Sequence, residues 1–171
     1  MLNYLIFIQI LMFSHPAFSY NADEMAQLNS TKICMNCNLN NSDLSGKILI
    51  NSNLLNSSIS NSTLNDAIFR YADLENVRFV KSDLINIDFT NANLKNTNFR
   101  LSDCTNSDFS STNLDNADFS GADLNGAIFE GAQLRNVNFR NANLEATFFA
   151  SADLTQAQLN QAALNNVNFS Y

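Results

Sequence analysis

The residues able to do chemistry are few, and the most specific of them is a cysteine pair. Cys34 and Cys37 form a C-x-x-C motif, and Cys104 is the third cysteine of the chain. A structural zinc site needs four ligands. The sequence adds only one further cysteine to this pair, because the only histidine, His15, lies in an N-terminal segment that we expect to be removed. A redox site would need a thioredoxin-like βαβ context, which is absent. We therefore predict a local disulfide between Cys34 and Cys37, with free thiols and a metal or redox site as the alternatives.

The carboxylates do not form a catalytic constellation. The sequence offers no histidine base for them, no P-loop, no dinucleotide fingerprint and no metal triad. We predict that the protein is not an enzyme and uses no cofactor. Sixteen acidic and nine basic residues give a net charge of −7, which is the opposite sign to that of a general nucleic-acid binder. Direct nucleic-acid binding is therefore not expected.

The first 19 residues have the form of a secretory signal peptide. An apolar run of about ten residues from Tyr4 to Phe13 is too short to span a bilayer, and it is followed by Pro16 and by small residues at 17 and 19. This pattern predicts cleavage after Ser19, and no stable membrane span if the leader is removed. An uncleaved apolar anchor is the alternative, because the n-region has no Lys or Arg. The leader predicts an exported protein, periplasmic or secreted, and is also compatible with a plastid lumen.

The rest of the sequence is organised as a repeat of five residues. From Leu39 to Phe169, a large apolar residue recurs every fifth position over 27 consecutive units without a register shift, and Cys104 is the single exception. We call this residue the core residue of its unit. Two residues earlier stands a small residue in 25 of these 27 units. Helices repeat every 3.6 residues and strands every two, so a period of five requires a short extended segment and a corner. The small and the large residue are two apart, and both therefore face inward.

This pattern resembles that of the pentapeptide repeat family, whose motif is a small residue, Asp or Asn, Leu or Phe, and two variable residues. The motif is clearest in the units centred on Leu74, Leu94, Leu124 and Leu154. The resemblance covers residues 37–169 and implies an all-β fold, a right-handed four-sided parallel β-helix with four pentapeptides per coil. It also implies one possible activity, because some members of the family are DNA mimics that bind type II topoisomerases, usually as dimers.

The core residues give an independent argument for four sides. From Leu64 to Phe149 they alternate between Leu and Phe, and Cys104 takes a Leu position, where it should be a buried thiol. Twenty residues per coil would stack the Phe residues in two core ladders on opposite sides, with neighbours about 4.8 Å apart. One ladder is Phe69, Phe89, Phe109, Phe129 and Phe149, and the other is Phe79, Phe99, Phe119 and Phe139.

The corners of the coils are assigned mainly to asparagine. The chain has only four glycines and one proline, and all four glycines stand two residues after a core residue. Thirteen asparagines share this position. Gly and Asn tolerate positive φ best, so this position should form the corner.

Both ends of the repeat carry predictions. Residues 21–31 should form a short helix with Asn21 as its cap and with Met25 and Leu28 on one face. The expected domains are a signal peptide at 1–19, a helical cap at 20–33 and the β-helix at 34–171. The sequence stops inside the repeat, and we expect the C-terminal coil to pair with a second copy as a homodimer.

The units at 45–60 depart most from the motif. Lys47 occupies a small inward position, and Ile48, Ile50 and Leu55 fall at outward positions. A local bulge or distorted coil is one interpretation, and a hydrophobic contact patch is the other.

Columns of outward residues twenty apart are the candidate interaction surfaces. Acidic residues gather on two neighbouring sides, at Asp83, Asp103 and Asp123 and at Asp88 and Asp108. They could bind a cation or a basic partner, or simply keep the rod soluble. The column of Asp88 and Asp108 also contains the candidate apolar contact residues Ile68, Ile128 and Phe148. In a further column Glu75, Lys95, Asp115 and Arg135 alternate in sign and predict an exposed ion ladder.

These features favour a non-enzymatic, exported structural or interaction module that presents a mixed acidic surface to an unidentified protein partner. The alternative, from the family resemblance, is a dimeric DNA mimic that binds a type II topoisomerase such as DNA gyrase in the cytosol. Acidity is compatible with the alternative, whereas the leader opposes it.

Overall fold

Each five-residue unit of the repeat forms a straight segment and a corner, as the sequence predicted. In this computed structural model, which describes residues 20–170, φ is positive at every position two residues after a core residue from Asn36 to Asn166, including the four glycines. Most of these positions carry Asn, but Tyr71, Lys81 and Leu101 also adopt this backbone. The predicted signal peptide, residues 1–19, lies outside the described residues.

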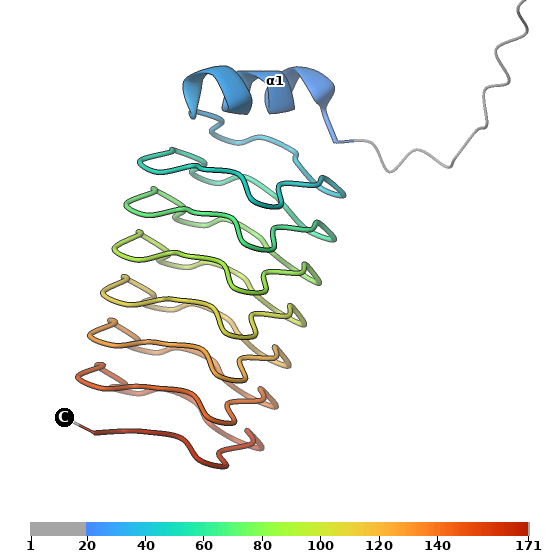
Figure 1. Cartoon of the computed structure of the whole chain (residues 1–171). Coiled ribbons are helices and arrows are strands. Elements are labelled where there is room, and N and C mark those ends of the chain that lie inside the picture. The colour runs from blue at the N-terminus through green and yellow to red at the C-terminus, as the bar shows by residue number, and fades with distance from the viewer. Residues whose placement is uncertain (1–19, 171) are drawn as a thin grey trace, which may run out of the picture.

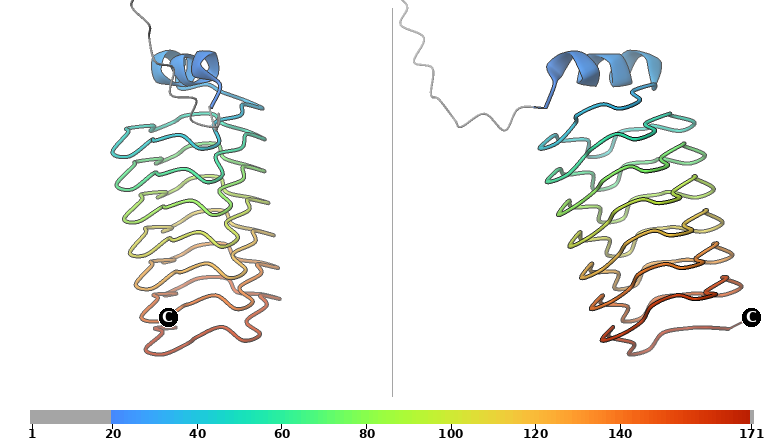
Figure 2. Two further views of the ribbon diagram at one scale, coloured as in Figure 1. Left: turned by 90° about the vertical axis from the view of Figure 1, so that its right-hand side faces the viewer. Right: turned by 180° about the vertical axis from the view of Figure 1, so that it is seen from behind.

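Four units make one coil, and the coils stack in parallel (Figures 1 and 2). Every backbone bridge joins residues twenty apart, beginning with Ile33 and Asn53 and ending with Phe148 and Asn168. The bridges are isolated pairs, because each straight segment is too short to form a longer strand. Each core residue from Leu39 to Phe149 donates its N–H to the coil that follows, for example from Leu44 to the Thr63 carbonyl at 2.8 Å.

The helix α1, Ala22–Thr31, covers the first coil (Figure 1). The Asn21 side chain accepts hydrogen bonds from the N–H groups of Asp23 and Glu24, which confirms the predicted cap. Met25 and Leu28 are the buried residues of α1, so the helix closes the apolar interior at this end.

The core is built from stacked side chains. The two Phe columns lie on opposite sides, with ring centroids of successive coils 4.5–5.6 Å apart, and rings of the two columns meet edge to face across the interior. The column of Phe69 also includes Phe169, 5.4 Å from Phe149. Core Leu residues fill the other two sides, and the Leu residues at core positions from Leu39 to Leu144 are buried.

The bulge considered for residues 45–60 does not form. Asp43, Ile48 and Asn53 bridge to Thr63, Ile68 and Asp73 in unbroken register. Lys47 is accommodated because its position is only half-buried, whereas the small inward residues beside it are buried. The outward Ile48 is 60 % exposed, so the departure from the motif changes the surface and not the backbone.

The last described coil is less enclosed than the others. Leu164 and Phe169 are 43 % and 46 % exposed. In earlier coils the N–H of each core residue reaches a carbonyl of the following coil, but among residues 20–170 no backbone acceptor faces the N–H groups of Leu154 and Leu159.

Candidate functional site: the outward side chains of the β-helix

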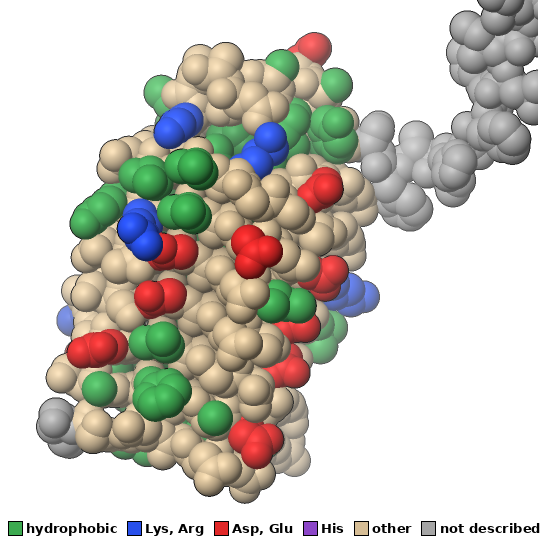
Figure 3. Space-filling model, in the orientation of Figure 1, with side chains coloured by type: hydrophobic (Ala, Val, Ile, Leu, Met, Phe, Trp, Pro, Cys, Tyr) green, Lys and Arg blue, Asp and Glu red, His purple; other side chains and the backbone are tan. Residues whose placement is uncertain are grey.

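One side of the β-helix carries a row of apolar and acidic residues that we call the mixed column. The bridges place its members on successive coils in the order Ile48, Ile68, Asp88, Asp108, Ile128 and Phe148. The column therefore has two apolar pairs on either side of an acidic centre, and Asn168 follows Phe148 on the last coil. Figure 3 shows hydrophobic side chains gathered near the α1 end and again near the opposite end of the visible face, with acidic side chains between them.

The two carboxylates of the mixed column differ in their partners. Asp88 pairs with Arg70 at 2.5 Å and accepts hydrogen bonds from the N–H and hydroxyl of Thr90. Partial burial raises the pKa of Asp88, but the bonds from Thr90 and Arg70 outweigh this effect and leave the pKa below its ordinary value. Asp108 accepts the N–H of Ser110 and has no ion pair with any described residue. The centre of the column thus keeps an unneutralised charge.

The neighbouring side carries the acidic column, which the structure places as predicted. Asp83, Asp103 and Asp123 bridge to one another in succession, and Asn143 follows. Asp103 and Asp123 each accept the N–H group two residues further on. No described Lys or Arg forms an ion pair with these three residues, and no group of three or more metal-ligating side chains occurs among residues 20–170.

The predicted ion ladder forms only in part. Arg135 pairs with Asp115 at 2.5 Å and approaches Asp153 at 4.0 Å. Glu75 and Lys95 join no ion pair among the described residues. They line a hollow of about 400 Å³ together with the amides of Asn91, Asn93, Asn113 and Gln133. Surface pairs of this kind contribute little to stability, so small differences in orientation decide which of them form.

An asparagine ladder at one corner was not predicted. Asn36, Asn56, Asn76, Asn96 and Asn116 are joined by side-chain hydrogen bonds of 2.8–3.3 Å between successive coils. The signal in the sequence was six asparagines spaced twenty apart at the corner position, from Asn36 to Asn136, of which the first five are joined. Because their amides hydrogen-bond to one another, we interpret the ladder as a structural feature that joins successive coils and not as a binding site.

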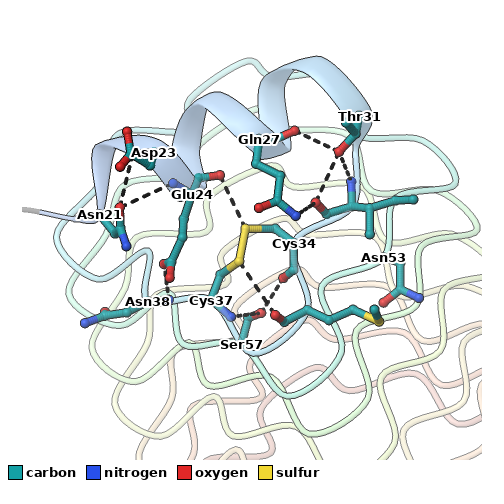
Figure 4. Close-up of a disulfide and its surroundings, with 12 residues drawn as sticks. Asn21, Asp23, Glu24, Gln27, Thr31, Cys34, Cys37, Asn38, Asn53 and Ser57 are labelled. Atoms are coloured by element: carbon teal, nitrogen blue, oxygen red, sulfur yellow. Dashed lines mark hydrogen bonds between the residues drawn. A yellow bond between two sulfur atoms is a disulfide. The ribbon is translucent and has the colours of Figure 1, made fainter.

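The cysteine pair lies beneath α1 (Figure 4). Cys34 and Cys37 are joined by a disulfide in the structure, and both are buried. The Ser57 hydroxyl donates to the Cys34 carbonyl at 2.6 Å and accepts the Cys37 N–H at 2.9 Å. The Glu24 side chain of α1 accepts the N–H of Asn38 at 2.6 Å. The pair thus forms part of the contact between the helix and the first coil.

The third cysteine is poorly placed for chemistry. Cys104 is a free thiol with no exposed surface. Burial raises the pKa of the Cys104 thiol to about 12, and the nearby charges of Asp103 and Asp123 act in the same direction. At neutral pH it remains a protonated, apolar filler of a Leu position.

The fold defines a class of protein, a four-sided solenoid. Its charged and apolar surface groups are arranged in columns of outward side chains. The family model for pentapeptide repeats matches the chain in four overlapping segments, 33–70, 67–103, 102–141 and 132–170. The chain belongs to the pentapeptide repeat family. Members of this family form right-handed quadrilateral β-helices. None of the helices in the described part of the chain is both long and apolar enough to cross a membrane.

Solved structures of the same family are similar to the chain. QnrB1, a plasmid-mediated fluoroquinolone resistance protein, is 20% identical over 81% of this chain and 75% of its own, with a TM-score of 0.53. Rfr23 from the cyanobacterium Cyanothece 51142 is 18% identical over 86% of this chain and 98% of its own, with a TM-score of 0.37. The protein alr5209 from Nostoc Pcc 7120 is 29% identical over 53% of this chain and 83% of its own, with a TM-score of 0.47. No curated protein sequence matches the chain significantly. At these identities the likeness to QnrB1 concerns the fold alone.

Proposed function

We propose that the protein is an exported, non-enzymatic interaction module whose mixed column binds a protein partner. The observation that carries this proposal is the order of the column, with apolar residues at both ends and the unpaired Asp108 at its centre. Ile48 and Phe148 are exposed, and Ile68 and Ile128 beside them are half-buried. Apolar surface of this kind on one side is typical of protein contact surfaces, and the rigid coils hold it at fixed spacing. Export is supported by the signal-peptide pattern of residues 1–19.

Two measurements test this proposal. Fractionation with N-terminal sequencing should find the protein outside the cytosol, beginning near Tyr20.

A photo-crosslinking residue placed at Phe148 should then capture a partner protein in that compartment, and Ile68→Ser should reduce the capture. A matched crosslinker at Val80, which lies on the opposite side, should not capture it. A cytosolic protein that starts at Met1 contradicts export, and equal capture from both sides contradicts the role of the mixed column.

The second candidate is a DNA mimic that binds a type II topoisomerase in the cytosol. The acidic column supports it, because Asp83, Asp103 and Asp123 form a row of carboxylates without basic partners on the same side. This alternative includes a homodimer through the C-terminal coil. Inhibition of DNA gyrase that is lost on Asp103→Lys, together with a dimer in light scattering, would favour this alternative over the first.

A further inference from the structure

From Ile68 to Phe148, the residues of the mixed column offer a partner no backbone hydrogen bonds, whereas the N–H groups of Ile48, Arg70 and Glu130 on the same side have no acceptor among the described residues. The N–H of Ile68 donates to the Lys47 carbonyl at 2.9 Å, and the Ile68 carbonyl accepts the N–H of Leu49 at 2.7 Å. The same arrangement recurs at Asp88, Asp108 and Ile128. Strand addition requires a free sheet edge with a row of N–H and carbonyl groups. An extended peptide finds no such row on this side, because the carbonyls of Ile68, Asp108 and Ile128 are engaged and the free N–H groups stand singly on separate coils. An α-helix satisfies its own backbone and contacts a surface through side chains alone.

The spacing of the column suits a helix that lies along the axis of the coils. Ile48 and Phe148 are five bridges apart, which corresponds to about 24 Å at the usual spacing between paired strands. A helix advances 1.5 Å per residue, so about 16 residues cover this distance. Apolar side chains near the two ends of such a helix would meet the two apolar ends of the column.

The negative charge at the centre of the column favours a basic residue at the middle of the partner helix. Arg70 already neutralises Asp88, whereas Asp108 has no ion pair among the described residues. Glu130 is exposed and lies on the next coil of the same side. A Lys or Arg at the middle of the helix would face these two carboxylates, and a carboxylate there would be repelled.

We infer that the partner docks through an amphipathic α-helix with apolar anchors at both ends and a basic residue at its centre. This inference rests on the proposed function and names the chemistry of the partner at the same surface. The anchors contact Ile48 and Ile68 at one end and Ile128 and Phe148 at the other. The basic residue pairs with Asp108 and Glu130 at the centre of the contact.

The inference is tested with a labelled helical peptide of about 18 residues, long enough to cover the column. The peptide carries Leu at both ends and Arg at the centre of one face, and the control peptide has the same composition with Arg at the ends and Leu at the centre. We expect fluorescence anisotropy with the full chain to show saturable binding of the first peptide, and binding of the control to be weaker by roughly tenfold or more. Equal binding of the two peptides overturns the inference.

Variants locate the contact. Phe148→Ser and Ile68→Ser should each weaken peptide binding by roughly tenfold, because each removes an apolar anchor. Val80→Ser, the matched control on the opposite side, should leave binding unchanged. Asp108→Lys should abolish binding of the Arg peptide, and a Glu-centred peptide should restore it, whereas Asp118→Lys on the opposite side should do neither. Circular dichroism of each variant confirms that the fold is intact.

The failures of the inference and of the proposed function are distinguishable. If the peptide does not bind while the crosslinker at Phe148 still captures a partner that Ile68→Ser releases, the helix is wrong and the interaction surface stands. If capture is also independent of the mixed column, both are wrong. A proline-containing extended peptide that binds as tightly as the helical one contradicts the inference as well.

Discussion

The corner positions demand a left-handed backbone whatever side chain they carry. Asparagine tolerates this conformation better than most residues, because its short polar side chain bonds locally. Ala146 is a corner residue with φ of 54° and has no such compensation. Ala142 occupies an inward position of the same coil, where it is only 1 % exposed.

The same substitution should therefore have opposite effects at these two positions. We expect Ala146→Gly to raise the free energy of unfolding by about 1 kcal/mol, because glycine adopts positive φ without steric cost. Ala142→Gly should lower it by about 1 kcal/mol or more, because a buried methyl group is lost and backbone freedom in the unfolded chain rises. Urea denaturation measures both, and two changes of the same sign would contradict this account.

At the residue scale, Asp88 also makes stability depend on pH. Its pKa in the folded protein lies below the ordinary value of 3.8, so the ionised carboxylate stabilises the folded state above that pH, and the stabilisation is lost as the pH falls through the folded pKa. We expect Asp88→Asn to destabilise the protein at pH 7 and the difference from wild type to shrink as the pH falls below 3.8. Chemical denaturation at several pH values tests this expectation, and a difference that persists to pH 2 argues against it.

At the scale of one side of a coil, identical residues in neighbouring coils interact. Asp103 bridges to Asp83 and Asp123, and like charges opposite each other are destabilising. An asparagine at this position keeps the oxygen that accepts the Thr105 N–H at 3.0 Å. The repulsion can therefore be removed without loss of the local turn.

We expect Asp103→Asn to stabilise the protein by about 0.2–1 kcal/mol at low ionic strength, and the gain to disappear in high salt because salt screens exposed charges. Asp118→Asn is the matched control, since Asp118 bridges to Asn98 and Asn138. Thermal unfolding at two salt concentrations separates the two variants. The same gain in both variants would show that like-charge repulsion is not the cause.

The N-terminal cap is a second element with its own stability. The disulfide closes a separation of three residues directly beneath α1, and a short loop of this kind contributes at most about 2 kcal/mol. We expect reductant to accelerate amide exchange in α1, for example at the Lys32 N–H that donates to Leu28, and to leave Leu144 unaffected. The double variant Cys34→Ser and Cys37→Ser should not respond to reductant. Uniform acceleration along the chain would rule out a local role for the disulfide.

At the scale of the whole molecule, each coil is stabilised by its two neighbours, as in other solenoids. Phe109 stacks on Phe89 and Phe129 at 5.3 and 4.8 Å and is fully buried. Among the described residues Phe169 stacks on Phe149 alone, and it is 46 % exposed. A defect in the middle should therefore interrupt the column, whereas a defect in the last coil affects one contact.

We expect Phe109→Ala to lower the free energy of unfolding by about 3–5 kcal/mol, and Phe169→Ala to lower it by about 1 kcal/mol because much of its ring is already in water. Denaturation monitored by circular dichroism measures both. Equal losses at the two positions would indicate that Phe169 is buried in solution, as it would be in the proposed homodimer.

Much of this fold follows from the sequence because the repeat is local. The spacing of Leu39, Leu44 and Leu49 already implies an inward pair and a corner, and the alternation of Leu and Phe supports twenty residues per coil. The burial of Cys104 follows from the same period, whereas the cap at Asn21 follows from the residue types at the start of the helix. The asparagine ladder was missed because the corner was considered one residue at a time. The bulge at 45–60 was considered because Lys47 falls at an inward position, but this position is only half-buried and the register stays unbroken.

The sequence by itself determined the core, the corners and the columns of outward residues, because every one of these repeats with a fixed period along the chain. Only the tertiary structure decided that Arg70 neutralises Asp88 and leaves Asp108 unpaired, and that Glu75 and Lys95 remain apart. The physical reason is the size of the energies involved. Burial of a ring contributes several kcal/mol and fixes the register, whereas an exposed ion pair contributes about 1 kcal/mol or less and depends on how two side chains of different coils lie.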